Sequence, residues 1–319
     1  KKSYSPQRKG YINLILPASK NVYNYYSKKN QDPGYQGYFE EQLIKKFQKF
    51  MGGGYVDAVS SGTAALFIAI RSLNLPSNSH ILVSAIADPG TINAIILNGL
   101  KPKLVDTEID SYNISIKKIK ERYNKQVSAI LAIHSSGQIV DMSPIIRFAK
   151  QKKIKVIEDC SQAHGGNIKR KKVGTFGDIA AFSCMYSKNL ILNGTGGIIF
   201  SKNFKFYRNI LLHGDRGKPV WKKSVNLKDP NQFKLPALNF QIDEISCAIG
   251  ILNLKKLNYL IYKRREILKI LKKRVNTYLG NQSKKWSFNY LGTVLSSIGL
   301  FGITQYLTFT SDSTIIKGL

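Results

Sequence analysis

The sequence predicts an α/β fold, in which a mainly parallel sheet is flanked by helices. Short apolar segments alternate with segments whose apolar residues recur at helical spacing, and this alternation is typical of βαβ units. Of the 319 residues, 43% are hydrophobic, which is enough for a buried core and excludes a disordered chain. At about 150 residues per domain, the length fits two domains, or one large domain with an appendage.

Each expected element follows from its own local pattern. Phe39, Leu43 and Phe47 lie on one face of an expected helix that glycines at 52–54 end. Ser60-Ser61-Gly62-Thr63 opens a second helix. Helices are expected over 39–50, 64–73, 91–97, 144–152 and 242–275, and strands over 55–59, 81–86, 103–106, 128–134, 155–159, 179–183 and 197–201.

The basic charge and the cysteines exclude several kinds of protein. The chain has 49 Lys+Arg against 19 Asp+Glu, a net charge of +30. The basic residues are spread along the whole chain, which favours a solvated lysine-rich surface over a nucleic-acid interface; attraction of an anionic substrate is the next alternative. Cys160, Cys184 and Cys247 are odd in number and widely spaced, so neither a disulfide framework nor a metal site is expected. They indicate a reducing compartment.

Chemistry should lie where parallel strands end, because such sheets bind ligands at their carboxyl ends. The turn at 60–66 either binds a phosphate at a helix N-terminus or only caps that helix. Asp159 ends a buried strand and either meets a cation, such as a protonated heterocyclic nitrogen, or is the N-cap of a following helix. Lys188 follows an apolar strand and is either a Schiff-base lysine activated by burial or a surface lysine. Glycines at 194–197 predict a tight turn.

Seven sequence blocks occur together in one order. They are SSGTAAL at 60–66, NGLKPKLVD at 98–106, HSSGQIVDM at 134–142, IEDCSQAHGG at 157–166, VGTFGDIAAFS at 173–183, SKNL with GTGG at 187–197, and LNFQIDEISCAIG at 238–250. By these blocks the chain resembles the DegT/DnrJ/EryC1/StrS family of pyridoxal-phosphate-dependent sugar aminotransferases from about residue 37 to 265. The resemblance implies the fold of aspartate aminotransferase, fold type I.

The resemblance also assigns roles to residues around the cofactor ring. Lys188 matches the lysine that binds pyridoxal 5'-phosphate covalently and then moves the substrate proton. Asp159 matches the acid that pairs with the pyridine nitrogen, and Gln162 matches the residue that hydrogen-bonds the ring hydroxyl. The cofactor performs the difficult chemistry, and the protein orients it.

Four further residues match ligands of the cofactor phosphate. They are the backbone groups of Gly62 and Thr63, the hydroxyl of Ser183, and Asn239, which in the family reaches the phosphate from the partner subunit. The resemblance therefore implies a homodimer with its active site at the interface.

The implied reaction moves an amino group, with glutamate as the expected donor, to a nucleotide-linked keto-sugar for amino-sugar or surface-polysaccharide synthesis. Relatives with histidine in place of the lysine are 3-dehydratases, so Lys188 favours transamination. A cytoplasmic protein without a nucleic-acid partner or membrane segment is expected. The alternative is a non-catalytic or truncated member that binds pyridoxal phosphate or a sugar nucleotide without turnover.

The chain departs from the family pattern at three places. Asp88-Pro89 stand in the segment where most relatives carry an aromatic residue that stacks on the cofactor, and Gln241 stands where relatives often have arginine. The chain also ends sooner after Arg265 than relatives do. We therefore expect a large cofactor-binding domain over 1–250, followed over 251–319 by a long helix and a shortened or divergent small domain.

The last segment has an unusual composition. Residues 286–311 carry no charge, and Lys284-Lys285 precede them. The length would span a bilayer, but Asn289, Gln305 and many hydroxyl residues dilute the apolar ones. We interpret it as a remnant of the small domain. A tail that docks on the dimer and a membrane segment are the alternatives.

Overall fold

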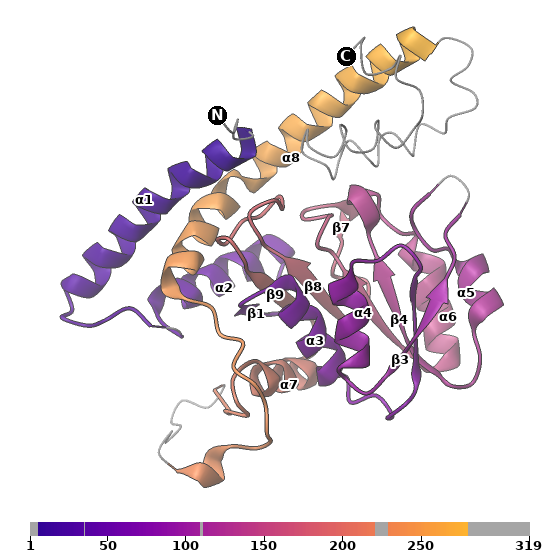
Figure 1. Ribbon diagram of the computed structural model, residues 1–319, viewed down its shortest axis with the longest axis horizontal. Coiled ribbons are helices and arrows are strands. Elements are labelled where there is room, and N and C mark those ends of the chain that lie inside the picture. Colours follow the sequence, from indigo (N-terminus) through magenta and orange to yellow (C-terminus); the bar gives the residue numbers. More distant parts are fainter. Residues whose placement is uncertain (1–5, 35, 109–110, 221–228, 280–319) are drawn as a thin grey trace.

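A seven-stranded sheet forms the centre of the protein (Figure 1). The structure is a computed structural model that describes residues 6–34, 36–108, 111–220 and 229–279. Its strands lie in the order β1-β9-β8-β5-β4-β2-β3. Their bounds are β1 Tyr55–Val59, β2 His80–Ser84, β3 Lys101–Val105, β4 Val127–Ile133, β5 Lys155–Asp159, β8 Ile179–Ser183 and β9 Gly197–Ser201. Within this sheet β9 is antiparallel to the other six strands, which are parallel to one another. The predicted mainly parallel sheet is therefore confirmed.

Helices cover both faces of the sheet, which explains why its central strands are largely apolar. One face packs on α3 (Gly62–Ser72), α4 (Pro89–Ile96) and α7 (Phe204–Gly214). The other face packs on α5 (Ile116–Arg122) and α6 (Met142–Lys152) at the β3 end, and on α1 (Pro6–Ser27), α2 (Tyr38–Met51) and α8 (Glu244–Leu279) at the β1 end. A small hairpin, β6 (Asn167–Ile168) with β7 (Lys171–Lys172), and the short turns η1 (Ser135–Gly137) and η2 (Pro230–Gln232) complete the described elements.

One buried carboxylate joins three helices. Glu244, the first residue of α8, accepts hydrogen bonds from the Tyr26 hydroxyl at 2.6 Å and from the Phe39 and Glu40 N–H groups at 2.8 Å each. The last two N–H groups lie in the first turn of α2, where they have no helical partner of their own. Glu244 therefore caps α2, and Tyr26 fixes the end of α1 beside it.

Most expected elements are present with small shifts in their ends. The strands expected over 155–159, 179–183 and 197–201 match β5, β8 and β9 residue for residue. Three helices were not predicted, namely α1, α5 and α7, because their apolar residues are interrupted by Lys, Asn or Tyr. α1 packs along α8 through Leu14, Ala18 and Val22 (Figure 1).

The predicted division into two domains stays a prediction. The expected boundary at residue 250 falls inside α8, which runs without a break from Glu244 to Leu279. The uncharged segment 286–311 lies outside the described residues. In the described part of the chain, no helix combines the length and the apolar character needed to cross a membrane.

Candidate functional site

Several predicted site residues lie at the edge where β1, β5 and β8 end. Asp159 is the last residue of β5, and Ser183 is the last residue of β8. The Ser161 N–H donates to Asp159 Oδ1 at 3.0 Å, and the Ser161 hydroxyl accepts from the Ser183 N–H at 2.9 Å. Ser161 therefore connects two of the predicted cofactor ligands across neighbouring strands.

The start of α3 closes one side of this edge. Ser61 caps the helix, because its hydroxyl oxygen accepts from the Ala64 N–H at 3.0 Å. Among the described residues, no hydrogen bond takes up the N–H groups of Gly62 and Thr63. A Cβ added at Gly62 would lie 2.4 Å from the Cβ of Ser183, so only glycine allows this close approach. The sequence alternatives were capping and phosphate binding; Ser61 performs the first and leaves two donors beside Ser183 for the second.

Asp159 uses only part of its hydrogen-bonding capacity. Asp159 is 6% exposed, and its Oδ1 accepts the Ser161 N–H in the turn after β5. No described helix begins in this turn, so the helix-cap alternative is wrong. Its Oδ2 accepts a bond of 3.4 Å from the hydroxyl of Thr91, in the first turn of α4. A carboxylate has about four acceptor sites, so Asp159 can still meet a cationic donor at the edge.

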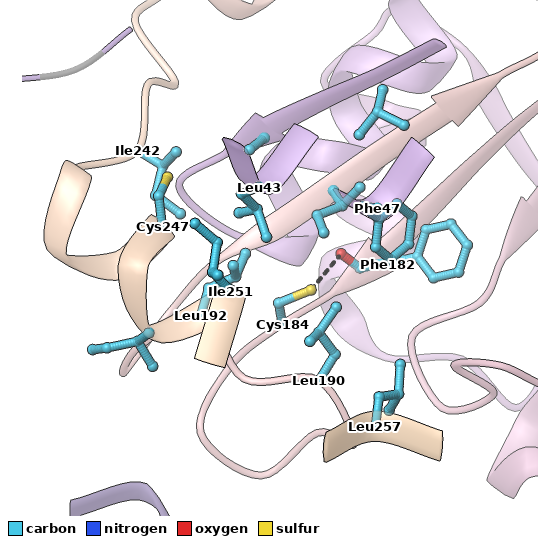
Figure 2. Packing of buried hydrophobic residues seen from close by; sticks show 14 of the residues in the cluster. Leu43, Phe47, Phe182, Cys184, Leu190, Leu192, Ile242, Cys247, Ile251 and Leu257 are labelled. Atoms are coloured by element: carbon cyan, nitrogen blue, oxygen red, sulfur yellow. Dashed lines mark hydrogen bonds between the residues drawn. The ribbon is translucent and has the colours of Figure 1, made fainter. Parts of the chain in front are cut away.

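Lys188 lies in the connection between β8 and β9, and the core holds this connection at both ends. Cys184, Leu190 and Leu192 are buried between α2 and α8, as Figure 2 shows. Asn253 of α8 accepts the Ile191 N–H at 2.9 Å. Lys188 itself is partly buried, so the interpretation as an ordinary exposed lysine is weakened.

The surroundings of Lys188 are poorly solvated. Burial, together with the charges of Lys188 and Arg264, lowers the pKa of His164 to about 3. Burial also raises the pKa of the Cys184 thiol, an effect that the charge of Lys188 partly opposes. Lys188 thus lies near two buried groups that are neutral near pH 7.

The structure places the other predicted residues less directly. The side-chain oxygen of Gln162 accepts the N–H of Ser136, in the turn after β4. Asn239 is exposed, and its Oδ1 accepts from the Gln241 N–H at 3.1 Å. The next residue, Phe240, accepts the Ser60 N–H at 2.8 Å, so this segment lies against the turn that opens α3. The role of Asn239 in a partner subunit stays a prediction.

Sequence reasoning missed a buried cluster of polar side chains on the other face of β5. Glu158 is fully buried and accepts from the N–H groups of Gly174, Phe176 and Gly177 at 2.7 to 2.8 Å and from His134 Nε2 at 3.1 Å. His134 Nδ1 accepts the Val140 N–H at 3.2 Å, which places the ring proton on Nε2. The possible ligand atoms of Cys160, His134 and Glu158 lie close enough together to hold a metal ion. Because His134 and Glu158 already hydrogen-bond each other and the backbone, we interpret this buried cluster as structural.

The sheet and the edge together define the class of protein. A lysine anchored after one strand, an acid at the end of the next, and a free helix N-terminus between them characterise a fold-type-I pyridoxal-phosphate-dependent transferase. A solved structure described as E. coli GDP-4-keto-6-deoxy-D-mannose-3-dehydratase with bound hydrated PLP superposes with a TM-score of 0.73 at 28% identity, over 82% of this chain and 70% of that one. The predicted fold class is confirmed.

The chain belongs to the DegT/DnrJ/EryC1/StrS aminotransferase family, whose model matches residues 27–287. It is 29% identical to GDP-perosamine synthase of Escherichia coli O157:H7 over 76% of this chain and 64% of the relative. It is 34% identical to dTDP-3-amino-3,6-dideoxy-alpha-D-galactopyranose transaminase of Aneurinibacillus thermoaerophilus over 71% of this chain and 60% of the relative. The chain thus spans about three fifths of these relatives.

The residues present fit the cofactor of this family, pyridoxal 5'-phosphate. The N–H groups of Gly62 and Thr63 are donors for a phosphate. Because Gly62 has no side chain, its backbone lies directly against Ser183, and a ligand there can reach the backbone N–H groups. The spare capacity of Asp159 suits a protonated ring nitrogen. Lys188 supplies an amine for the aldehyde from a connection that the core fixes at both ends.

Proposed function

We propose that this protein is a pyridoxal-phosphate-dependent aminotransferase that moves an amino group from glutamate to a nucleotide-linked keto-sugar. The observation that supports the proposal most directly is that Asp159 ends β5 while Lys188 follows the neighbouring parallel strand β8, each next to buried residues. The names of the two relatives, a perosamine synthase and an amino-sugar transaminase, support a nucleotide-sugar substrate. Such a product would serve amino-sugar or surface-polysaccharide synthesis.

Each residue of the edge has a part in this reaction. The cofactor supplies an aldehyde for the amine and a ring that accepts electrons. With the cofactor bound and its own amine freed by the donor, Lys188 Nζ would take the proton from the α-carbon of the amino donor and deliver it to the aldehyde carbon of the cofactor, as general base and then general acid. Asp159 faces the ring nitrogen and keeps its proton in place. Gln162 holds the ring hydroxyl.

The phosphate end of the site fixes the cofactor without taking part in proton transfer. The N–H groups of Gly62 and Thr63 donate to the phosphate at the positive end of the α3 dipole, and the Ser183 hydroxyl adds a further donor. We further propose that Asn239 reaches the phosphate of a second copy, so that the protein acts as a homodimer in the cytoplasm.

Dehydration of a keto-sugar is the nearest alternative chemistry, because a solved dehydratase shares the fold. Lys188 favours transamination, because the lysine amine can both bind the cofactor aldehyde and move the proton of the amino donor. A member that binds the cofactor or a sugar nucleotide without turnover is the second candidate.

The test compares the full chain with Lys188→Ala after incubation with pyridoxal phosphate. We expect the native chain to develop a visible absorption band and to form 2-oxoglutarate from glutamate with a set of nucleotide-linked keto-sugars. We expect the variant to lose the band and at least about 10²- to 10⁴-fold in rate, the usual contribution of a general acid–base group.

Lys202→Ala is the matched control, because Lys202 is exposed and follows β9 at the opposite edge of the sheet. A native chain that stays colourless with the cofactor would overturn the proposal. A coloured chain that transfers no amino group from glutamate to any of the sugars would favour the second candidate.

A further inference from the structure

We propose that Thr91 is a positioning residue for the cofactor: its hydroxyl orients the carboxylate of Asp159 toward the ring nitrogen. This inference rests on the proposed function for the identity of the cofactor, but it concerns the binding step, which can be measured without turnover.

The contact between the two side chains is shielded from water. Thr91 Oγ1 donates to Asp159 Oδ2 over 3.4 Å, while Thr91 is 1% exposed and Asp159 is 6% exposed. A hydroxyl in such a place needs a partner, because burying a polar group without a hydrogen bond costs free energy. Catalytic hydrogen bonds are often long before the ligand binds, and they tighten in the complex.

Other bonds restrain the rest of Asp159. Its carbonyl oxygen accepts the His134 N–H at 3.1 Å, which fixes the backbone within the sheet. Its Oδ1 accepts the Ser161 N–H at 3.0 Å. What remains is the rotation of the carboxylate plane, and a donor on Oδ2 sets that rotation. Because each carboxylate oxygen accepts about two bonds, Thr91 leaves room on Oδ2 for the ring N–H.

The start of α4 holds Thr91 in place. Asp88 caps this helix by accepting the Gly90 N–H at 2.8 Å, and its carbonyl accepts the Thr91 N–H at 2.9 Å. A Cβ added at Gly90 would lie 2.6 Å from Thr63 Oγ1, so the starts of α3 and α4 are in direct contact. The segment that has Asp88-Pro89 in place of an aromatic residue therefore serves the cofactor through Thr91.

The experiment compares Thr91→Val, which keeps the shape and removes the hydroxyl, with Thr91→Ser, which keeps the hydroxyl. Pyridoxal phosphate is titrated into each full-length apo-protein, and the dissociation constant is measured by absorbance and by quenching of intrinsic fluorescence. We expect Thr91→Val to bind about tenfold more weakly, the order of effect of one hydrogen bond to a charged group, and Thr91→Ser to restore most of the affinity.

A control and a second readout separate positioning from packing. Thr175→Val makes the same change at another buried threonine, whose hydroxyl donates to the Lys172 carbonyl at 2.7 Å, and it should leave the dissociation constant unchanged. At saturating cofactor, a positioning role predicts that Thr91→Val lowers kcat more than it changes the KM for glutamate.

The outcomes are distinct. Equal affinity in native and Thr91→Val proteins of unchanged melting temperature would overturn the inference, and so would Thr91→Ser binding as weakly as Thr91→Val. If Thr91→Val does not fold, the comparison of Thr91→Ser with the native chain decides, because the inference predicts nearly equal affinity. Native protein that binds the cofactor but transfers no amino group would contradict the proposed function while leaving this inference intact.

Discussion

Two neighbouring acids on one strand, Glu158 and Asp159, have opposite surroundings. Successive residues of a strand point to opposite faces, so the two carboxylates of β5 belong to different regions of the molecule. Glu158 is fully buried and accepts four hydrogen bonds from the loop before β8 and from His134. Asp159 lies at the open edge and accepts two, one on each oxygen.

This difference separates a structural acid from a functional one. A buried carboxylate whose acceptor sites are all used holds the chain together and has nothing left for a ligand. Asp159 is restrained by two donors and retains capacity for a third. Both acids are buried, so burial does not distinguish them. An acid that is held in place but has unused hydrogen-bond acceptor sites is the better sign of function here.

The largest effect should follow the loss of the charge at Asp159. Asp159→Asn keeps an oxygen for the Ser161 N–H but no longer attracts a protonated ring nitrogen. We expect transamination to fall by about 10²- to 10³-fold, the range seen when one preorganised electrostatic group is removed, while the melting temperature changes little. Steady-state rates and thermal unfolding of the same preparation measure both. A variant with normal activity would remove Asp159 from the site.

A smaller effect, on stability, should follow the matching change at Glu158. In Glu158→Gln, an NH₂ group faces donors such as the Gly174 N–H or His134 Nε2, and we expect a loss of about 3 kcal/mol of unfolding free energy. Urea unfolding of the apo-protein measures it. Glu121→Gln is the control, because Glu121 is exposed and pairs only loosely with Lys118, so its loss should stay within about 0.5 kcal/mol. Equal stability of both variants would contradict the structural role of Glu158.

The smallest effect concerns a buried acid with few donors. Burial, and next the charge of Asp57, raises the pKa of Glu40 to about 8 from its ordinary 4.5, although the Gln36 N–H partly offsets this. The folded chain then keeps a proton that the unfolded chain has released. The free energy of unfolding should therefore fall as the pH rises from about 4.5 to about 8, and level off above that.

Glu40→Gln tests this explanation by removing the titrating group while keeping an acceptor for Gln36. We expect the variant to match the native chain at low pH and to be more stable than the native chain near the upper end of this window, because it carries no carboxyl that must lose its proton. Urea unfolding at several pH values measures it. A native stability that rises across the window would contradict the assigned direction.

Much of the fold could be predicted because most of its strands are short, apolar and separated by segments of helical periodicity. β5, β8 and β9 were found residue for residue. α1 was missed because tertiary packing on α8, rather than its own apolar pattern, holds it in place. A local pattern cannot show a partner that lies more than two hundred residues away in the sequence.

The site was predicted in part, and mostly from the resemblance to a family. Residues alone indicated that chemistry lies where the strands end; the structure places Asp159 at the end of β5 and Gly62 against Ser183 at the end of β8, while the role of Lys188 stays a prediction. Thr91 could not be found in this way, because a threonine in an expected helix has many other roles. Asn239 stays a prediction, since its expected ligand belongs to another subunit.

The junction at Glu244 has a consequence for how the chain is made. The first turn of α2 is capped by a residue that follows it by 205 and 204 positions. Since chains emerge from the ribosome at about 5 to 20 residues per second, α2 waits on the order of ten seconds or more for its cap. Until then, its hydrophobic face lacks the cover of α8 and is available to a chaperone.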